Sequence, residues 1–384
     1  MLAGRPTILN YEDARALARR RLPRGLFEYV DRGTEDERAI AGNRRALDDI
    51  RLTPRTLVDV STCSQSISLF GRSQPSPIVI APTAVAGLLW HDGEVELAKA
   101  AAGQGIPFCV ATQSITSIER IAAASQAPLW FQLYVWKDRQ RTFQLVDRAR
   151  NAGAEALVLT IDTARPPKRE YNTRNGFGIP LQPSVTAALD VLSHPAWFTS
   201  VFLKYLLRSG VPSYAHYPQE FRTRLGRIAI GDELGLAADL TWDDVRELRG
   251  KWRGPLVLKG MLSVEDAKTA ADCGVDGIVV SNHGARNLDC APGPTEVLER
   301  IVEKIGERMT VLSDSGVRRG SDIAKFLSLG AKAVLVGRAP LYGVAIDGAA
   351  GAGQVLQMLR RELEVVMALL GAVCVQDLVG RHRC

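Results

Sequence analysis

The sequence contains eight short apolar runs, each of which ends in a polar or small residue. Of all its features, this one restricts most strongly which folds the chain can adopt. The runs cover residues 77–84, 107–112, 129–135, 156–162, 255–260, 277–282, 310–316 and 333–338. They are nearly continuous in Val, Ile and Leu, which is typical of strands buried on both faces of a parallel sheet. Between them lie helical patterns that close on glycine, such as 93–105, 263–274 and 320–330.

This alternation predicts a (β/α)8 TIM barrel of the α/β class, because eight such units fit the roughly 250 residues of that fold. A doubly wound open sheet is the alternative, but it needs a Gly-rich first turn, GxGxxG, which the sequence lacks. We expect residues 1–384 to form one barrel domain. Residues 1–75 are predicted to be an N-terminal helical extension. Residues 164–250 are predicted to be an insertion after the fourth strand, too long for an ordinary connection.

Composition excludes several classes of protein. The 384 residues contain 48 Lys and Arg against 42 Asp and Glu, with only 6% aromatic residues, so neither a disordered acidic chain nor a nucleic-acid-binding protein is indicated. The 6 cysteines form no CxxC pair, and we expect no metal site and no disulfide framework. The N-terminus has no apolar stretch of a secretory signal, and we expect a cytoplasmic protein.

One amphipathic segment, residues 196–208, lies within the predicted insertion. Its apolar stripe contains Trp197, Phe198, Val201, Phe202, Tyr205 and Leu206. Lys204 and Arg208 lie elsewhere on the same predicted helix. Two interpretations are open: a lid or subunit contact, or peripheral attachment of residues 190–210 to the inner face of the cytoplasmic membrane.

Polar side chains follow nearly every predicted strand. They are Thr83, Gln132, Tyr134, Thr160, Asp162, Lys259, Ser281, His283, Asp314 and Arg338. Because a TIM barrel forms its active site at the C-terminal ends of its strands, this set predicts a catalytic centre at one mouth of the barrel. Any one of these residues alone would be explained better by ordinary packing.

The segments after the seventh and eighth strands predict a phosphate site. Small residues and arginines follow both strands, in DSGVRRG (314–320) and VGR (336–338). Barrels commonly hold a phosphate there, through backbone N–H groups and a cation. The residues assigned to this role are Ser315, Gly316, Arg318, Gly337 and Arg338.

A second group predicts a carboxylate site beside a base. His283 and Arg286 share one loop, and Arg169 follows the fourth strand. Two guanidiniums facing one cavity need an anion between them, and a carboxylate binds arginine in bidentate geometry. A histidine beside that carboxylate indicates removal of a nearby proton, with Asp162 stabilising the imidazolium. A buried Lys259 suits an anion that develops during reaction, such as a reduced flavin.

At these motifs, SNHGARNLD (281–289) and DSGVRRG (314–320), the sequence resembles the FMN-dependent 2-hydroxy-acid dehydrogenase/oxidase family, in particular its mandelate and lactate dehydrogenase branch. The resemblance covers nearly the whole chain, from residue 21 to residue 343. It implies FMN as cofactor and oxidation of an L-2-hydroxy acid, lactate-like or mandelate-like, to the 2-oxo acid. Electrons would pass to a quinone, a soluble carrier or O2, and the implied assembly is a homotetramer.

The resemblance also implies roles for single residues. His283 is the base that takes the Cα proton, or the hydroxyl proton if a hydride leaves instead. Arg169 and Arg286, assisted by Tyr29, hold the substrate carboxylate, and Tyr134 bonds the substrate oxygen. The residues implied for the flavin ring and ribityl chain are Pro82, Thr83, Ala84, Gln132, Thr160, Lys259, Ser281 and Asp314. The phosphate site inferred from position agrees with the family.

Several positions depart from the family pattern. Ser315 stands where a glycine is usual, and Ala285 replaces the second glycine of HGGR; both residues are small enough to be tolerated. Gln113 is polar at a position that usually faces the substrate side chain.

Other reactions remain open on the residues alone. Another FMN barrel, such as an isopentenyl-diphosphate isomerase or a nucleotide dehydrogenase, would keep the phosphate site but have no use for Arg169 and Arg286 around His283. A non-redox lyase or isomerase would bind a phosphorylated substrate at the phosphate site. A barrel that has lost catalysis and only binds ligands would have no reason to keep His283, Lys259 and both arginines.

Overall fold

Eight parallel strands close into a barrel in the computed structural model, which describes residues 7–177, 184–218 and 234–382. The strands follow one another around the barrel in chain order, and β10 pairs with β3 to close it. They are β3 (Ile78–Ile80), β4 (Phe108–Ala111), β5 (Leu129–Leu133), β6 (Ala156–Thr160), β7 (Leu256–Met261), β8 (Gly277–Val280), β9 (Thr310–Ser313) and β10 (Val334–Val336). The predicted (β/α)8 barrel and its eight strands are confirmed.

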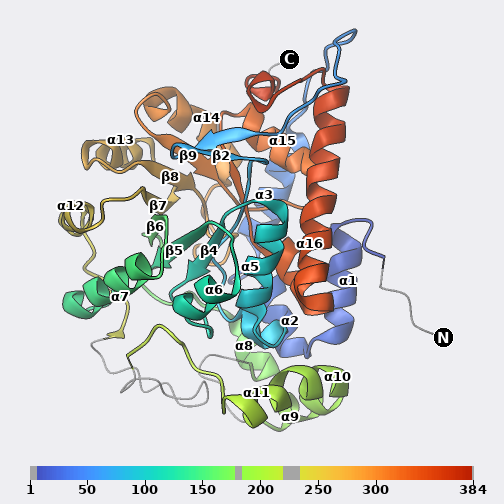
Figure 1. The fold of residues 1–384 in the computed structure, drawn as a ribbon, viewed down its shortest axis with the longest axis vertical. Coiled ribbons are helices and arrows are strands. Elements are labelled where there is room, and N and C mark those ends of the chain that lie inside the picture. The colour runs from blue at the N-terminus through green and yellow to red at the C-terminus, as the bar shows by residue number, and fades with distance from the viewer. Residues whose placement is uncertain (1–6, 178–183, 219–233, 383–384) are drawn as a thin grey trace.

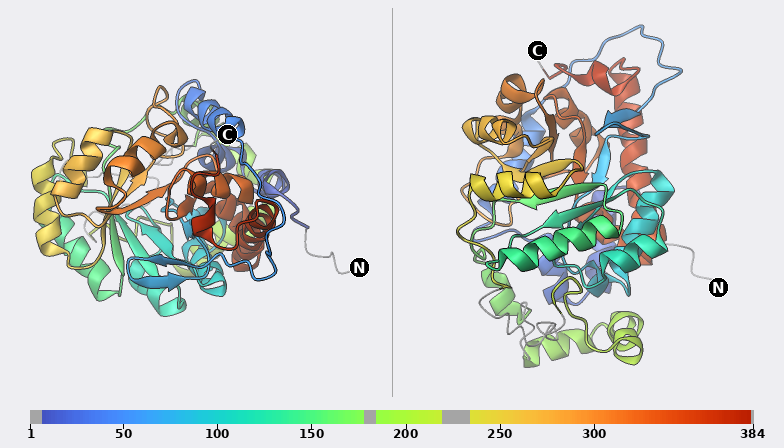
Figure 2. Two further views of the ribbon diagram at one scale, coloured as in Figure 1. Left: turned by 90° about the horizontal axis from the view of Figure 1, so that it is seen from above. Right: turned by 60° about the vertical axis from the view of Figure 1, so that its left-hand side comes forward.

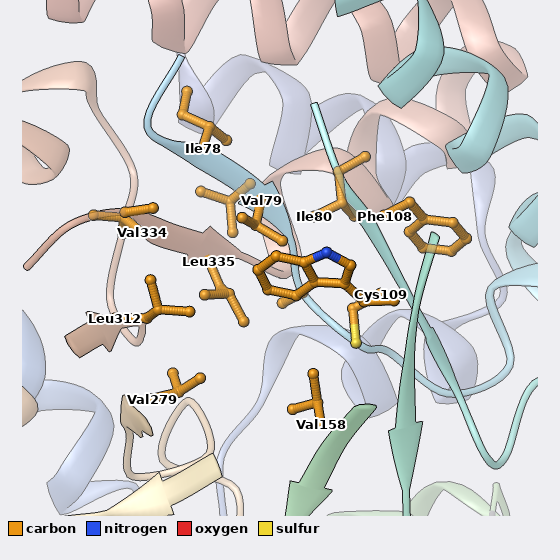
Figure 3. Packing of buried hydrophobic residues seen from close by; sticks show 14 of the residues in the cluster. Ile78, Val79, Ile80, Phe108, Cys109, Val158, Val279, Leu312, Val334 and Leu335 are labelled. Atoms are coloured by element: carbon orange, nitrogen blue, oxygen red, sulfur yellow. The ribbon is translucent and has the colours of Figure 1, made fainter. Parts of the chain in front are cut away.

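The barrel core consists of the apolar runs recognised in the sequence. All eight barrel strands contribute side chains to this core. Figure 3 shows Ile80, Cys109, Val158, Val279 and Leu335 among them. Parallel pairing also aligns polar residues at the strand ends, since Thr160 of β6 pairs with Lys259 of β7. The fold therefore places the functional side chains at one mouth of a packed core.

Helices surround the strands on the outside (Figure 2). They are α4 (Ala86–Leu89), α5 (Gly93–Gln104), α6 (Ile118–Ala124), α7 (Arg139–Asn151), α12 (Trp242–Lys251), α13 (Val264–Asp272), α14 (Pro294–Ile305), α15 (Gly320–Ser328) and α16 (Arg338–Leu369), followed by the 3-10 turn Val375–Leu378. Side-chain caps explain several starts: Ser117, Asp138 and Ser263 each accept a hydrogen bond from a backbone N–H of the first turn.

The N-terminal residues form three helices, α1 (Tyr11–Arg21), α2 (Arg24–Asp31) and α3 (Arg38–Asp49). A hairpin of β1 (Ile67–Leu69) and β2 (Arg72–Gln74) follows. The expectation of helices alone for residues 1–75 is wrong for this hairpin, because strands of three residues leave almost no periodic pattern. Its turn is visible in the backbone, where Phe70 and Gly71 have positive φ angles of 50° and 79°.

Between β6 and β7 the chain forms α8 (Glu170–Asn175), α9 (Val185–Leu192), α10 (Pro195–Trp197), a π-helical turn (Phe198–Phe202) and α11 (Leu203–Arg208). α9, α10 and α11 lie together at one end of the molecule (Figure 1). α12, which ends this stretch, packs as an ordinary barrel helix. Residues 178–183 and 219–233 of the predicted insertion lie outside the described residues.

The apolar stripe predicted at 197–206 packs mainly against the protein itself, which corrects its interpretation as a docking face. Trp197, Val201 and Tyr205 are buried. The Trp197 indole N–H donates to the Leu88 carbonyl at 2.7 Å, and the Asp92 N–H donates to the Tyr205 hydroxyl at 2.9 Å. Of the stripe, only Leu206 is among the exposed large apolar side chains, and the others exposed here lie outside it: Val185, Leu189, Leu192 and Leu207. Within the described residues, no helix is long and apolar enough to cross a membrane.

Candidate active site

A cavity of about 1400 Å³ opens at the C-terminal ends of the strands. Nearly all of the predicted site residues line it, from Pro82, Thr83 and Ala84 after β3 to Gly337 and Arg338 after β10. Two predicted residues, Asp162 and Ser281, do not line the cavity and lie one layer behind its wall, where they contact His283. The structure thus brings the predicted residues together from seven strand ends and the N-terminal extension.

His283 and Asp162 form a hydrogen-bonded pair, with 2.9 Å between Nδ1 and Oδ1. Burial lowers the pKa of His283, and the opposing attraction of Asp162 does not restore it. Burial raises the pKa of Asp162, but the charges of His283 and Lys259 and the hydrogen bond from His283 bring it below its usual range. A neutral imidazole that donates Nδ1–H to a carboxylate leaves Nε2 free to accept a proton, which is the state required of a general base.

Two guanidiniums face the same part of the cavity. The Arg169 and Arg286 guanidiniums lie 5.8 Å and 5.1 Å from the ring centre of Tyr29. Their donors reach only carbonyl oxygens: Arg169 bonds the Arg286 carbonyl at 3.2 Å, and Arg286 bonds the Arg32 carbonyl at 2.9 Å. Neither has a carboxylate partner in the described part of the chain. Burial and the neighbouring Arg169 lower the pKa of Arg286 to about 10, so an anion between the two would relieve their repulsion.

Lys259 supplies a fixed positive charge at the buried end of the cavity. Its ammonium lies 3.2 Å from Asp314 Oδ2 and donates to Ser281 Oγ at 3.0 Å. Burial lowers the pKa of Lys259, but Asp314 and Asp162 raise it further, so the ammonium stays charged. Burial and the charge of Asp162 raise the pKa of Tyr134 to about 12, so this phenol remains a hydrogen-bond donor.

A polar edge lies beside this charge. The Gln132 amide donates to Thr160 Oγ1 at 3.0 Å and accepts from the Thr112 N–H at 3.2 Å. Thr83 Oγ1 is buried and has no hydrogen-bond partner in the described residues. An unpaired buried hydroxyl on a cavity wall is satisfied when a polar ligand fills the cavity.

The predicted phosphate end is strongly basic. Arg318 contacts Glu12 at 3.2 Å, and Arg338 donates to the carbonyls of Val30 and Arg32 at 3.0 and 3.2 Å. A Cβ built on Gly337 would meet nothing closer than 3.8 Å, so the backbone there is open to the cavity. A cationic end, a central cavity and a buried ammonium beside a polar edge fit the phosphate, the ring system and the pyrimidine of FMN.

From the N-terminal extension and the insertion, the sequence predicted Tyr29 and Arg169, but it missed other residues that these segments contribute. Arg44 of α3 lines the phosphate end and pairs with Asp322 at 2.7 Å. Tyr214 and Tyr217 stack at 5.2 Å between ring centres and also line the cavity. These residues share no strand-end position, so only the tertiary structure identifies them.

Comparisons with known proteins agree with this geometry. Residues 18–383 match the family described as FMN-dependent dehydrogenase. An L-lactate dehydrogenase of Caulobacter vibrioides (strain NA1000 / CB15N) is 42% identical over 365 residues, 94% of this chain and 93% of that protein. An (S)-mandelate dehydrogenase of Pseudomonas putida is 41% identical over 364 residues, 95% of this chain and 91% of that protein.

Among solved structures, that of a monotopic membrane protein, (S)-mandelate dehydrogenase, superimposes with a TM-score of 0.92. It is 39% identical in sequence, and the match covers 98% of this chain and 99% of that one. The family resemblance, the reaction class and the cofactor expected from the sequence are confirmed. This chain belongs to the FMN-dependent dehydrogenase family, and its reaction is the FMN-dependent oxidation of a 2-hydroxy acid.

Proposed function

We propose that this enzyme oxidises an L-2-hydroxy acid of the lactate or mandelate type and passes the electrons to a quinone at a membrane surface. The observation that carries the substrate assignment is the convergence of Arg169 and Arg286 on one cavity that also holds His283. A phosphorylated substrate would not need this second anion site. A nucleotide substrate would not need it either.

In the proposed reaction the carboxylate binds between Arg169 and Arg286, with the ring of Tyr29 against both guanidiniums. His283 Nε2 takes a proton from the substrate, and Asp162, 2.9 Å from Nδ1, stabilises the imidazolium that results. Tyr134 donates a hydrogen bond to the oxygen on C2. Bound FMN supplies the acceptor for the electron pair that leaves C2.

The remaining residues hold the cofactor in this proposal. The ammonium of Lys259, fixed by Asp314, provides positive charge where a reduced flavin would carry negative charge. Gln132, Thr160 and Thr83 offer polar groups to the ring, and the basic residues after β9 and β10 hold the phosphate. Ser281 contributes through Lys259 and His283 because it does not line the cavity.

Anaerobic reduction of the bound flavin tests the proposal. Lactate, glycolate, long-chain and aromatic 2-hydroxy acids are mixed with the yellow enzyme, and at least one should bleach it within seconds. His283→Ala should retain the colour and bleach about 10²–10⁴ times more slowly. A wild-type protein that no 2-hydroxy acid bleaches would exclude this substrate class, and a His283→Ala variant of normal rate would remove the histidine from its role.

Membrane attachment is proposed for the surface of α9 and α11. Val185, Leu189 and Leu192 stand on one face of α9, all more than half exposed, and Leu207 of α11 is 78% exposed. The similar (S)-mandelate dehydrogenase is a monotopic membrane protein. These observations support attachment to a membrane surface. We propose that this surface is the inner face of the cytoplasmic membrane and that a membrane quinone is the acceptor. A soluble carrier and O2 are the alternatives.

We further propose a single domain spanning residues 1–384 that assembles as a homotetramer. The first part is supported by the site itself, to which the N-terminal extension contributes Tyr29. The second follows from the family resemblance. The loop after α3, in which Leu57 is fully exposed, offers a surface for a subunit contact and projects from the end of the molecule opposite α9–α11 (Figures 1 and 2). The molar mass in solution measures the assembly.

A further inference from the structure

The turn that carries His283 has an unusual backbone. His283, Gly284 and Ala285 follow one another with φ angles of 59°, 64° and 61°, all in the left-handed region. Residues with a Cβ adopt this region only at an energetic cost, and two of these three have one. Something outside the turn must therefore hold it.

Each of the three backbone N–H groups of this turn bonds a different side chain. The His283 N–H donates to Ser281 Oγ at 3.0 Å. The Gly284 N–H donates to Ser315 Oγ at 3.0 Å, and the Ala285 N–H donates to Asn282 Oδ1 at 3.1 Å. Ser281 and Asn282 belong to the same segment as the turn, so they shape it locally. Ser315 belongs to the next strand end, so it alone of these three ties the turn to β9.

Ser315 also closes a ring of polar contacts with Lys259. Its hydroxyl donates to Asp314 Oδ1 at 2.7 Å, and Asp314 Oδ2 lies 3.2 Å from the Lys259 ammonium. Lys259 in turn donates to Ser281 Oγ at 3.0 Å, and Ser281 accepts from the His283 N–H. Lys259 is thus joined to the His283 turn by two routes. One runs through Ser281, and the other runs through Asp314 and Ser315.

We propose that the Ser315 hydroxyl is a positioning group that fixes the His283 turn for proton transfer. Ser315 is itself buried and has a φ of 79°, a conformation that glycine adopts without cost. A serine at this position is therefore disfavoured by its backbone. The two hydrogen bonds of its hydroxyl, from the Gly284 N–H and to Asp314 Oδ1, compensate for this backbone cost. This inference rests on the proposed role of His283 as base.

Because the Ser315 hydroxyl contacts the His283 turn and not the carboxylate site, its loss should lower turnover and leave substrate binding unchanged. Arg286, three residues beyond His283, is anchored separately by the Arg32 carbonyl at 2.9 Å. Arg169 forms no hydrogen bond with the polar groups around Lys259 in the described residues; it bonds the Arg286 carbonyl. Loosening the turn should therefore misalign His283 against Asp162 while leaving the carboxylate site in place.

Two substitutions separate the hydroxyl from the backbone. Ser315→Gly removes the hydroxyl and relieves the positive φ, whereas Ser315→Ala removes the hydroxyl and keeps the Cβ. For Ser315→Gly we expect normal flavin content and thermal stability, KM within about twofold, and kcat lowered by about tenfold or more. Ser315→Ala should show the same loss of kcat with a lower melting temperature. Ser328→Ala, at a buried serine whose hydroxyl bonds the Lys325 carbonyl at 2.8 Å, is the matched control.

A pH profile and an NMR titration show whether the Ser315 hydroxyl positions His283 or only stabilises the fold. In Ser315→Gly the imidazole regains solvent, so its pKa should rise toward the ordinary value and the acid limb of kcat/KM should move to higher pH. The protein has 5 histidines, and ¹³Cε1 labelling with a His283→Gln assignment follows the same titration without turnover. This second readout tests the turn even if no 2-hydroxy acid is a substrate. An unchanged titration with normal kcat, or a loss confined to flavin content or melting temperature, would overturn the proposal.

Discussion

At the scale of single residues, the carboxylate site opposes the stability of the protein that contains it. Arg169 and Arg286 are like charges close together, and both are half-buried. Arg169→Met removes one charge from this pair. We expect the free energy of unfolding of the ligand-free protein to rise by about 1 kcal/mol. The KM for the 2-hydroxy acid should rise about tenfold to hundredfold, the value of one or two charge-assisted hydrogen bonds.

Arg169→Lys is the control for this prediction. It keeps the charge and therefore the repulsion, but it loses the planar fork that binds a carboxylate. It should raise KM without stabilising the protein. Thermal unfolding and steady-state kinetics on the two variants decide the matter. Equal stability of Arg169→Met and the wild type would show that the two guanidiniums do not repel each other appreciably.

The residues that the strand pattern alone could predict are those that follow a strand, whereas Tyr29 of α2 was predicted only through the family resemblance. His283, Lys259 and Asp314 stand at strand ends, and a barrel brings all strand ends to one mouth. Arg44 could not be predicted, because it reaches the phosphate end from α3, far away in the chain. Nor could the sequence show that Ser281 faces Lys259 and the His283 turn instead of the cavity, since that depends on side-chain geometry.

At the scale of elements, a buried histidine fastens the insertion to the barrel. His216 Nε2 accepts from the Ile118 N–H at 2.9 Å, and its Nδ1 lies 3.1 Å from the Thr112 carbonyl, so the ring joins residues 214–217 to the β4–α6 loop. Burial lowers the pKa of His216 to about 4. The folded state therefore binds fewer protons than the unfolded state between about pH 4 and 6.5.

This difference gives the sign of a pH effect. The free energy of unfolding should fall as the pH falls from about 6.5 to 4, and His216 should account for about 3 kcal/mol of that fall. In His216→Gln this part of the slope should disappear. Ser114→Ala, which removes a buried hydroxyl from the same loop but no titrating group, should lower stability equally at all pH values. Urea unfolding at several pH values measures both. A slope that His216→Gln leaves intact would contradict the assignment.

Elements differ in how well the sequence predicted them. The eight barrel strands could be predicted because each is a continuous apolar run buried on both faces. The stripe at 197–206 had the correct periodicity, but periodicity does not say what the apolar face packs against. Trp197 and Tyr205 bond the backbone of Leu88 and Asp92 in the barrel, so the stripe is an internal contact.

At the scale of the whole molecule, the apolar surface of α9 and α11 lies at one end, and the C-terminal end of α16 lies at the other (Figure 1). Inserting an exposed leucine into the lipid interface yields about 1.5–3 kcal/mol, so three of them give reversible binding of useful strength. Lys204 and Arg208 of α11 add attraction to anionic lipids that salt would screen. The proposed membrane face is therefore testable by lipid composition and ionic strength.

A triple variant tests the membrane face; it carries Leu189→Glu, Leu192→Glu and Leu207→Glu. When vesicles containing phosphatidylglycerol are sedimented, this variant should remain in the supernatant, whereas the wild type should sediment with them. Its flavin should still be reduced by the 2-hydroxy acid at the wild-type rate, and a short water-soluble quinone should reoxidise it normally. Reduction of a long-chain quinone embedded in the vesicles should be lost. Val365→Glu with Val379→Glu, at side chains 57% and 60% exposed, is the matched control and should bind vesicles normally. A wild-type enzyme that does not bind the vesicles would contradict the proposed acceptor, and so would one that passes its electrons to O2 faster than to either quinone. In both cases the apolar face of α9 would have no part in electron transfer.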